Sequence, residues 1–216
     1  MIRRTSKSWV KDLLTGHPEW AILDLGCGRY AWEEATHHAD RVDHSDLYKH
    51  HTVCDAHDTP YEDNQFDFVI CSHIAEHMPD MPKFLDEVSR IGKAGYIEVP
   101  SPFFENLTFG NLYEHCWWVE FDDGDNHLTY TTKMSLVKER LWPEELKRLE
   151  DYFRTQMVTQ LYWEDDIQYK QTYIPAELIP PEGTHADLFP SPLVRELAYE
   201  EEKAGTDFHV PGYVKK

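Results

Sequence analysis

Ile22-Leu-Asp-Leu-Gly-Cys-Gly-Arg29 is the stretch of sequence that decides the fold. The apolar run at residues 20–25 has the length and composition of a buried strand, and it stops at Gly26. A strand that runs into Gly-x-Gly and then into a helix is the usual opening of a nucleotide-binding βα unit, because the glycines permit a tight turn and close backbone approach. Gly-x-Gly alone is weak evidence, so the nature of the ligand depends on the residues that follow.

Strand and helix patterns alternate through residue 100. This alternation predicts a parallel sheet covered on both faces, and the right-handed crossover rule makes it a doubly wound, Rossmann-like α/β sheet. We expect helices at residues 5–15, 32–38 and 79–91, and strands at residues 20–25, 41–43, 52–55, 66–71 and 95–99.

The pattern changes after residue 100. Residues 116–121 and 127–132 flank a glycine-containing loop and predict an antiparallel β-hairpin. A charged amphipathic helix is expected at 143–157, then extended segments near 161–163 and 169–174, and an irregular C-terminal extension with a short helix near 193–203. We therefore divide the chain into a domain at 1–174, with an aromatic insert at about 101–135, and a proline-containing tail at 175–216.

Three aspartates follow successive predicted strands. Asp24 lies directly before the glycine loop, where a carboxylate is unfavourable beside a pyrophosphate but suits a ligand that carries an ammonium group. Asp43 ends the next predicted strand, where an acidic side chain accepts hydrogen bonds from ribose hydroxyls. Asp55 ends the third, in position to accept from an adenine amino group. Together the three carboxylates predict a pocket for a cationic nucleoside.

Each of these aspartates has an alternative. Asp24 could instead cap the turn that follows it. Asp40 or Asp46 could take the place of Asp43, since strand ends are predicted only to within a residue or so, and Asp58 could take the place of Asp55.

Three motifs then carry a family resemblance: Ile22-Leu-Asp-Leu-Gly-Cys-Gly28, Asp55-Ala-His-Asp-Thr-Pro-Tyr61 with its continuation to Ser72-His-Ile-Ala-Glu-His77, and Ile91-Gly-Lys-Ala-Gly-Tyr-Ile-Glu-Val-Pro100. In this order, over roughly residues 20–100, they resemble the class I methyltransferases that depend on S-adenosyl-L-methionine (SAM), the type 11 group in particular. The resemblance implies SAM as cofactor and a seven-stranded sheet with one antiparallel edge strand.

The resemblance also implies roles for individual residues. Gly26 and Gly28 would flank the methionine part of SAM, and Asp43 would bind the ribose. Asp55, Ala56 and His57 would border the adenine. We add Cys27, between the two glycines, and Ser72, at the end of the fourth predicted strand, to the candidate cofactor-binding residues.

The methyl acceptor should approach over the end of the fourth strand, at Ser72-His-Ile-Ala-Glu-His77. His77 and, second to it, His73 are the candidate catalytic bases, because an imidazole titrates near neutral pH. The alternative is that this turn only shapes the cofactor pocket and that one histidine binds a backbone group.

An aromatic segment at residues 103–118 departs from the plainest members of the group. It is a candidate acceptor wall, with Tyr113 and His115 as candidate substrate-binding residues, since apolar walls with a few polar groups suit small-molecule pockets. The alternative, equally weighted, is that these aromatic side chains pack the hairpin onto the core.

The net charge of −19, from 21 basic and 40 acidic residues, argues against nucleic acid as a partner. Binding to a phosphate backbone needs clustered lysine and arginine, and here basic residues gather only in pairs. No apolar run reaches the length of roughly 18 residues that crosses a bilayer, so no membrane partner is expected. Four cysteines without paired spacing predict reduced thiols, and hence a cytoplasmic protein.

No metal is expected. Histidines are frequent, yet the sequence has neither paired cysteines nor His-Glu-x-x-His spacing. The leading hypothesis is therefore a SAM-dependent methyltransferase acting on an oxygen or nitrogen of a small metabolite or saccharide-like acceptor. The alternatives are a protein or peptide methyltransferase, and a SAM-binding accessory or sensor module without turnover. The oligomeric state is not predicted.

Overall fold

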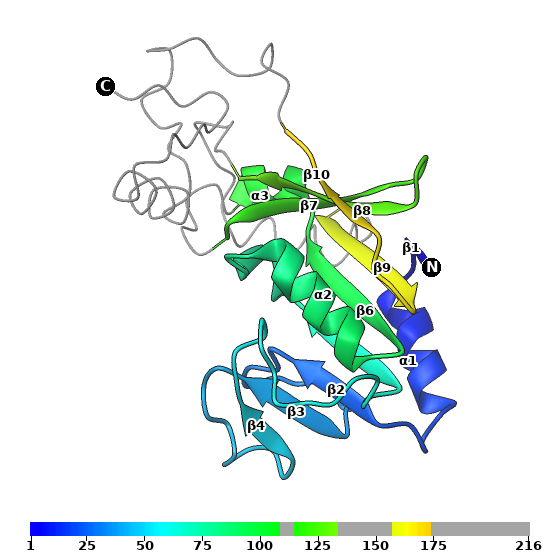
Figure 1. Ribbon diagram of the computed structural model, residues 1–216, viewed down its shortest axis with the longest axis vertical. Helices are drawn as coiled ribbons and strands as arrows, with labels where there is room; N and C mark the ends of the chain where they lie inside the picture. Colours follow the sequence, from blue (N-terminus) through cyan, green and yellow to red (C-terminus); the bar gives the residue numbers. More distant parts are fainter. Residues whose placement is uncertain (109–114, 134–156, 174–216) are drawn as a thin grey trace.

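The computed structural model describes residues 1–108, 115–133 and 157–173, and Figure 1 shows their arrangement. The elements are β1 (Ile2–Arg4), α1 (Lys7–Thr15), β2 (Ile22–Leu25), β3 (His37–Asp40), β4 (His51–Val53), β5 (Phe68–Ser72), the 3₁₀ helix η1 (Ala75–His77), α2 (Met81–Ile91), β6 (Ala94–Pro100), α3 (Pro102–Thr108), β7 (Trp117–Asp122), β8 (His127–Thr132), β9 (Val158–Glu164) and β10 (Tyr169–Gln171).

A seven-stranded sheet in the order β1-β9-β6-β5-β2-β3-β4 forms the centre of the molecule. The pairs among β2, β3, β4, β5 and β6 are parallel. The chain adds β3 and β4 on one side of β2 and then β5 and β6 on the other, so the strand order reverses between β2 and β5. Ligands of open α/β sheets bind outside the carboxyl ends of the strands at such a reversal. The predicted Rossmann-like sheet is confirmed.

One strand of the large sheet runs against the others, but it is not the edge strand. β9 pairs antiparallel with β6 and also with β1, so β1 is the edge and β9 is second from it. The expectation of an antiparallel edge strand was therefore wrong. The N-terminal residues, which carried no strand signal in the sequence, take the edge position because β9 leaves its second side open to pairing.

The two faces of the sheet pack against different helices, as the alternation of side chains along a strand requires. In β2, Ile22 packs with Val10 and Leu14 of α1. Its neighbours Leu23 and Leu25 pack in the other core cluster, which contains Phe84, Leu85, Val88 and Ile91 of α2. The sheet is thus covered on both faces. Both helices begin at polar N-caps, with Ser6 accepting from the Trp9 N–H and Asp80 from the Lys83 N–H.

The segment between β2 and β4 differs from the prediction. No helix forms at residues 32–38; turns lead from the glycine loop directly into β3 at His37. The strand expected at 41–43 is displaced to His37–Asp40, which pairs with both β2 and β4. Thr36 fixes the start of β3, since its N–H and its Oγ1 both donate to the Ile22 carbonyl, at 2.9 and 3.0 Å.

A second, three-stranded sheet in the order β10-β8-β7 crosses the carboxyl end of β6 (Figure 1). The predicted hairpin is confirmed, with β7 and β8 antiparallel. Hydrogen bonds attach it to η1 and to the residue after η1: the Cys116 N–H donates to the Glu76 carbonyl at 2.7 Å, and Trp117 Nε1 donates to the Met78 carbonyl at 2.6 Å. The helix expected at 143–157 lies almost wholly outside the described residues, and the tail at 175–216 with its short helix lies entirely outside them.

The described residues include no helix that combines the length and the apolar character needed to span a membrane. None of the four cysteines forms a disulfide, as expected. Burial raises the pKa of the Cys54 thiol to about 11 and that of the Cys27 thiol to about 12, so both stay protonated near neutral pH.

Candidate active site

The turn after β2 requires glycine at position 26. Gly26 has φ +76°, and a Cβ there would lie 2.6 Å from Cδ1 of Ile74. The turn is held by the strand that follows, because the N–H groups of Gly26 and Cys27 both donate to the Ala39 carbonyl, at 2.7 and 3.2 Å. The backbone of the glycine loop is therefore pressed against the turn after β5, where Ile74 lies.

Asp24 lies beneath this loop rather than on the cavity wall. Its side chain is on the α1 face of the sheet and accepts a hydrogen bond from the Trp32 N–H at 2.8 Å. Burial raises its pKa to about 6, although the Trp32 N–H and nearby Lys7 act in the opposite direction. The turn-capping alternative for Asp24 is thus present in the structure.

The acid at the end of β3 is Asp40, not Asp43. Asp40 accepts from the Gly28 N–H and from the Val42 N–H, each at 2.9 Å, and its side chain borders the cavity described below. Asp43 is an exposed turn residue that accepts from the Ser45 N–H. The predicted position of Asp43 at a strand end was wrong, because β3 ends three residues earlier.

Asp55 follows β4 in a turn that keeps its carboxylate exposed. The backbone N–H of His57 donates to Asp55 at 2.8 Å, and the His57 ring lies 2.7 Å away. The backbone hydrogen bond, followed by the ring, lowers the pKa of Asp55. The carboxylate is therefore an ionised acceptor at the rim of the sheet.

A cavity of about 740 Å³ lies at the carboxyl ends of β2, β3, β4 and β5, where the strand order reverses. This volume is in the range of small-molecule sites, and the wall combines apolar side chains with a few polar groups. Among the described residues the lining is Leu25, Gly26, Asp40, Arg41, Val53, Cys54, Asp55, Ala56, His57, His73, Ile74, His77, Met78 and Pro79.

The cavity brings together six of the residues predicted from the sequence: Gly26, Asp55, Ala56, His57, His73 and His77. Others predicted for the cofactor or the acceptor are not in that lining: Asp24, Cys27, Gly28, Asp43, Ser72 and His115. Tyr113 lies outside the described residues. The sequence reasoning missed Arg41 and preferred Asp43 to Asp40, although Asp40 was an open alternative.

His73 has an unusual backbone and a charged neighbourhood. Its φ is +57°, rare for a residue with a side chain, and its N–H donates to the Glu98 carbonyl at 2.8 Å. Its ring nitrogens lie 3.4 Å from carboxylate oxygens of Glu76 and Glu98. Burial alone would lower the pKa of His73, but the two carboxylates outweigh it and raise the pKa to about 9. His73 is therefore an imidazolium near neutral pH.

A group of polar side chains lies behind His77, under the small sheet. The rings of His77 and His115 meet edge to face with centroids 4.4 Å apart. Buried Glu76 adjoins them, and the three residues offer ligand atoms that lie within 4.8 Å of one another. The sequence reasoning missed Glu76 and Glu98, since a glutamate in an apolar segment gives no signal of what it will face once buried.

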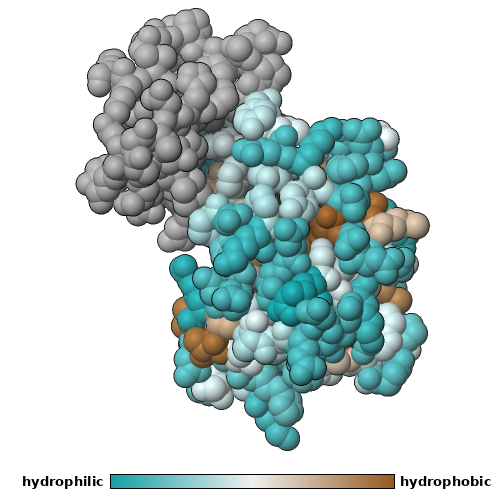
Figure 2. Space-filling view, in the orientation of Figure 1, coloured by the Kyte–Doolittle hydropathy of each residue, from teal (hydrophilic) through white to brown (hydrophobic). Residues whose placement is uncertain are grey.

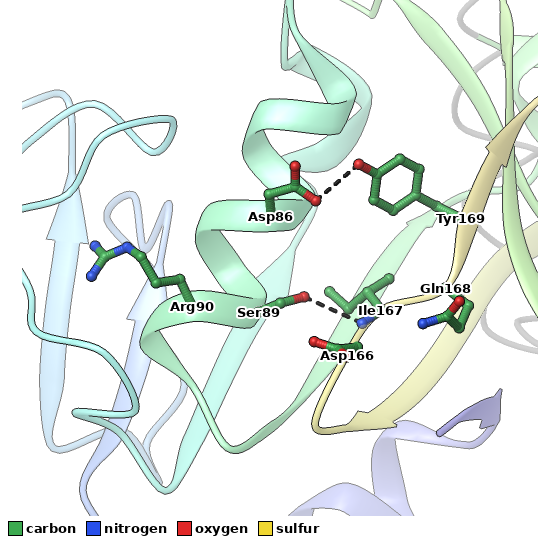
Figure 3. A pocket seen from close by; sticks show the side chains of 7 residues that line it. All are labelled: Asp86, Ser89, Arg90, Asp166, Ile167, Gln168 and Tyr169. Atoms are coloured by element: carbon green, nitrogen blue, oxygen red, sulfur yellow. Dashed lines mark hydrogen bonds between the residues drawn. The ribbon is translucent and has the colours of Figure 1, made fainter.

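A separate hollow of about 510 Å³ lies between α2 and the connection from β9 to β10 (Figure 3). Its contacts attach that connection to the helix: the Tyr169 hydroxyl donates to Asp86 at 2.8 Å, and the Ile167 N–H donates to the Ser89 hydroxyl at 3.2 Å. It shares no lining residue with the larger cavity and contains no glycine loop or strand-end acid. We therefore regard it as a packing feature.

The fold and the larger cavity define a class: a Rossmann-like α/β domain with a nucleotide-type pocket at the reversal of its strand order. Residues 23–97, about a third of the chain, match the family model described as a methyltransferase domain. The match agrees with the resemblance of this segment's motifs to the class I SAM-dependent methyltransferases of the type 11 group.

Solved structures similar to this chain differ widely in sequence. A SAM-dependent methyltransferase from Thermotoga maritima, described as a possible histamine N-methyltransferase, is 19% identical with a TM-score of 0.38; the match covers 43% of this chain and 48% of that one. The YcgJ protein from Bacillus subtilis is 17% identical with a TM-score of 0.40, and the match covers 51% of this chain and 61% of that one. The 1,6-didemethyltoxoflavin-N1-methyltransferase from Burkholderia thailandensis is 12% identical with a TM-score of 0.38, and the match covers 74% of this chain and 82% of that one.

The chain thus spans less than two thirds of the length of the first two of these structures. No curated protein sequence matches it.

Proposed function

We propose that this protein transfers the methyl group of SAM to an oxygen or nitrogen of a small metabolite or saccharide-like acceptor. The observation that carries the proposal is the cavity at the reversal of the strand order, which joins the glycine turn, two strand-end acids and three histidines in about 740 Å³. A walled cavity of this size suits a cofactor with a small acceptor better than it suits an extended chain.

The residues of the cavity fit SAM. Asp55 is an exposed, ionised carboxylate beside the small side chain of Ala56, an arrangement suited to an adenine ring with its amino group. Asp40 already accepts two backbone hydrogen bonds, but a carboxylate offers about four lone-pair sites and retains capacity for ribose hydroxyls. We therefore assign the ribose to Asp40 in place of Asp43.

His73 and His77, the two cavity histidines that follow β5, would have different roles. SAM supplies an electrophilic methyl group, and the enzyme contributes mainly the in-line placement of the acceptor. His73 is protonated near neutral pH and held by Glu76 and Glu98, so it can orient an acceptor or donate to it but is poorly suited to remove a proton. His77 is the residue whose loss should slow transfer most.

Formation of S-adenosylhomocysteine from SAM tests the proposal. Full-length protein would be incubated with SAM and panels of hydroxylated, saccharide and amine acceptors. We expect product with at least one panel, a fall in kcat of about 100-fold or more in His77→Ala, and SAM affinity within about threefold of wild type in that variant. Product formed only with protein substrates would overturn the choice of acceptor.

One observation favours a second candidate, a SAM-binding module without turnover. The helix that usually follows the glycine loop is replaced by turns at residues 29–36, so the cavity has no helix N-terminus beside the loop. Such a module would bind SAM and form no S-adenosylhomocysteine with any acceptor, which the same assay detects.

A further inference from the structure

We propose that Glu76, His77 and His115 form a binding site for one divalent transition-metal ion beside the cavity. Glu76 and His77 come from η1, and His115 comes directly before β7. One ligand atom of each lies within 4.8 Å of the others, close enough for a shared ion after small side-chain movements. One carboxylate and two imidazoles are a ligand set used for Zn²⁺ and Fe²⁺, with coordination positions left open.

Glu76 supplies an independent reason to expect a cation. Its side chain is about 2% exposed, and within the described part of the chain neither carboxylate oxygen accepts a hydrogen bond. Its closest charged neighbour is the His73 ring, at 3.4 Å. A buried carboxylate is costly unless it is paired, and His73 pairs with one oxygen of Glu76 only, at a distance longer than that of a charge-assisted hydrogen bond. The other oxygen is left to bind a metal ion.

His115 is oriented in the way that metal-bound histidines usually are. Its Nδ1 lies 2.5 Å from a carboxylate oxygen of buried Glu105. A histidine that donates through Nδ1 carries its lone pair on Nε2, and a carboxylate on the far side of the ring fixes that tautomer. Glu105 is itself held by Lys133, whose Nζ lies 2.5 Å from the other oxygen.

The backbone fixes the two ligand-bearing segments to each other. The Cys116 N–H donates to the Glu76 carbonyl at 2.7 Å. This main-chain hydrogen bond holds His77, which follows Glu76, next to His115, which precedes Cys116. The His77 side chain reaches the cavity wall, whereas Glu76 and His115 are buried. Because His77 also lines the cavity, an ion held by the three would lie beside the cavity wall.

The position of the ion suggests a role in binding the methyl acceptor, and this role rests on the proposed function. An acceptor hydroxyl or carboxylate in the cavity could bind the open positions, which would hold its oxygen in place and lower the pKa of a hydroxyl. His77 would then serve as a ligand, and its loss would slow transfer because the ion is lost. Metal binding itself does not depend on methyl transfer, so the two proposals can fail separately.

Zinc titration of the chelator-treated, full-length protein by isothermal calorimetry tests the site. We expect one high-affinity Zn²⁺ per chain in wild type and an affinity at least about 100-fold lower in Glu76→Gln and in His77→Asn. Glu105→Gln, which removes the charged partner of His115 and of Lys133 but no metal ligand, should lose about tenfold. His17→Ala is the matched control, because His17 faces Glu19 in a similar His–carboxylate pair on the surface, and it should bind Zn²⁺ as wild type does.

Thermal melts without metal would establish that each variant folds. Because two ligands and one supporting residue are each substituted, the test still holds if one of the three variants does not fold. Absence of a high-affinity Zn²⁺ in wild type, or an unchanged affinity in folded Glu76→Gln and His77→Asn, would overturn the site. S-adenosylhomocysteine formation by a wild-type protein that binds no metal would overturn this inference and leave the proposed function intact.

Discussion

Gly26 illustrates how one residue positions the cavity wall. Alanine at this position would combine a positive φ with a Cβ 2.6 Å from the Ile74 side chain. Both the glycine turn and the Ile74 side chain would therefore have to shift. We expect Gly26→Ala to lower the free energy of unfolding by about 2–4 kcal/mol, measured by urea denaturation, and to weaken SAM binding.

Gly28→Ala is the control. Its φ is +52°, but no atom lies within 4 Å of an added Cβ, so only backbone strain of about 1–2 kcal/mol is expected. Equal destabilisation by the two substitutions would contradict the argument from the Ile74 contact.

His73 gives a prediction for pH. Its pKa is raised in the folded protein to about 9 from an ordinary value of 6.5, so its contribution to stability is complete below about pH 6.5 and is lost as the pH rises through 9. Because the side chain is 43% exposed, solvent screening reduces the effect to roughly 1 kcal/mol. Wild type should lose about this much relative to His73→Gln between pH 7 and pH 10, in urea titrations. A constant difference between the two proteins would contradict the ion pairs with Glu76 and Glu98.

At the level of elements, α2 anchors the segment that carries Asp55. Buried Glu87 of α2 accepts from the Thr59 N–H at 2.7 Å and from the Thr59 hydroxyl at 2.6 Å, and it is paired with Arg90. Burial would raise the pKa of Glu87, but Arg90 and Thr59 outweigh it and lower the pKa to about 2. The carboxylate thus fixes the loop after β4 to the helix.

Glu87→Gln should therefore destabilise the fold by about 2 kcal/mol at pH 7. The lowered pKa means that the contribution is present above pH 4.5 and is lost as the pH falls toward 2, so the difference from wild type should shrink over that range. Asp63→Asn, which removes the exposed partner of Arg90, should change stability by less than about 1 kcal/mol in the same denaturation series. A larger effect from Asp63 than from Glu87 would refute this assignment.

Elements with a strong periodic or apolar signal were predictable from the sequence. α1, α2, β2, β5, β6 and the β7–β8 hairpin lie within a few residues of their predicted positions. The structure of residues 32–38 was not predictable from the sequence. Trp32 to Ala35 suit a helix locally, but the Thr36 hydrogen bond and the pairing of β3 with β2 and β4 impose an extended path. Val42 was predicted as a strand residue because it is apolar, but it is 52% exposed and lies outside β3, of which only Ala39 is fully buried.

The same limit applies to the candidate site. Gly26, Asp55, His73 and His77 were predictable because each directly follows a recognisable strand or lies in the turn after it. Asp40 depended on a strand end that the sequence places only approximately. Glu76, Glu98 and Glu105 depend on tertiary packing that brings distant segments together, and a single sequence gives no measure of it.

At the scale of the whole molecule, the acidic composition appears as a largely hydrophilic surface with small, separate hydrophobic patches on the face shown in Figure 2. Such a surface favours solubility and disfavours binding to polyanions. The candidate site lies at the carboxyl edge of the large sheet, the edge at which the small sheet crosses β6 (Figure 1).

Calorimetric titration of SAM into wild type, Asp40→Asn and Asp43→Asn tests the central claim most directly. We predict one SAM per chain in wild type, an affinity about 10- to 100-fold lower in Asp40→Asn because hydrogen bonds to a charged acceptor are lost, and an affinity within about twofold of wild type in Asp43→Asn. No SAM binding by the wild-type protein, or a loss of affinity in Asp43→Asn but not in Asp40→Asn, would contradict it.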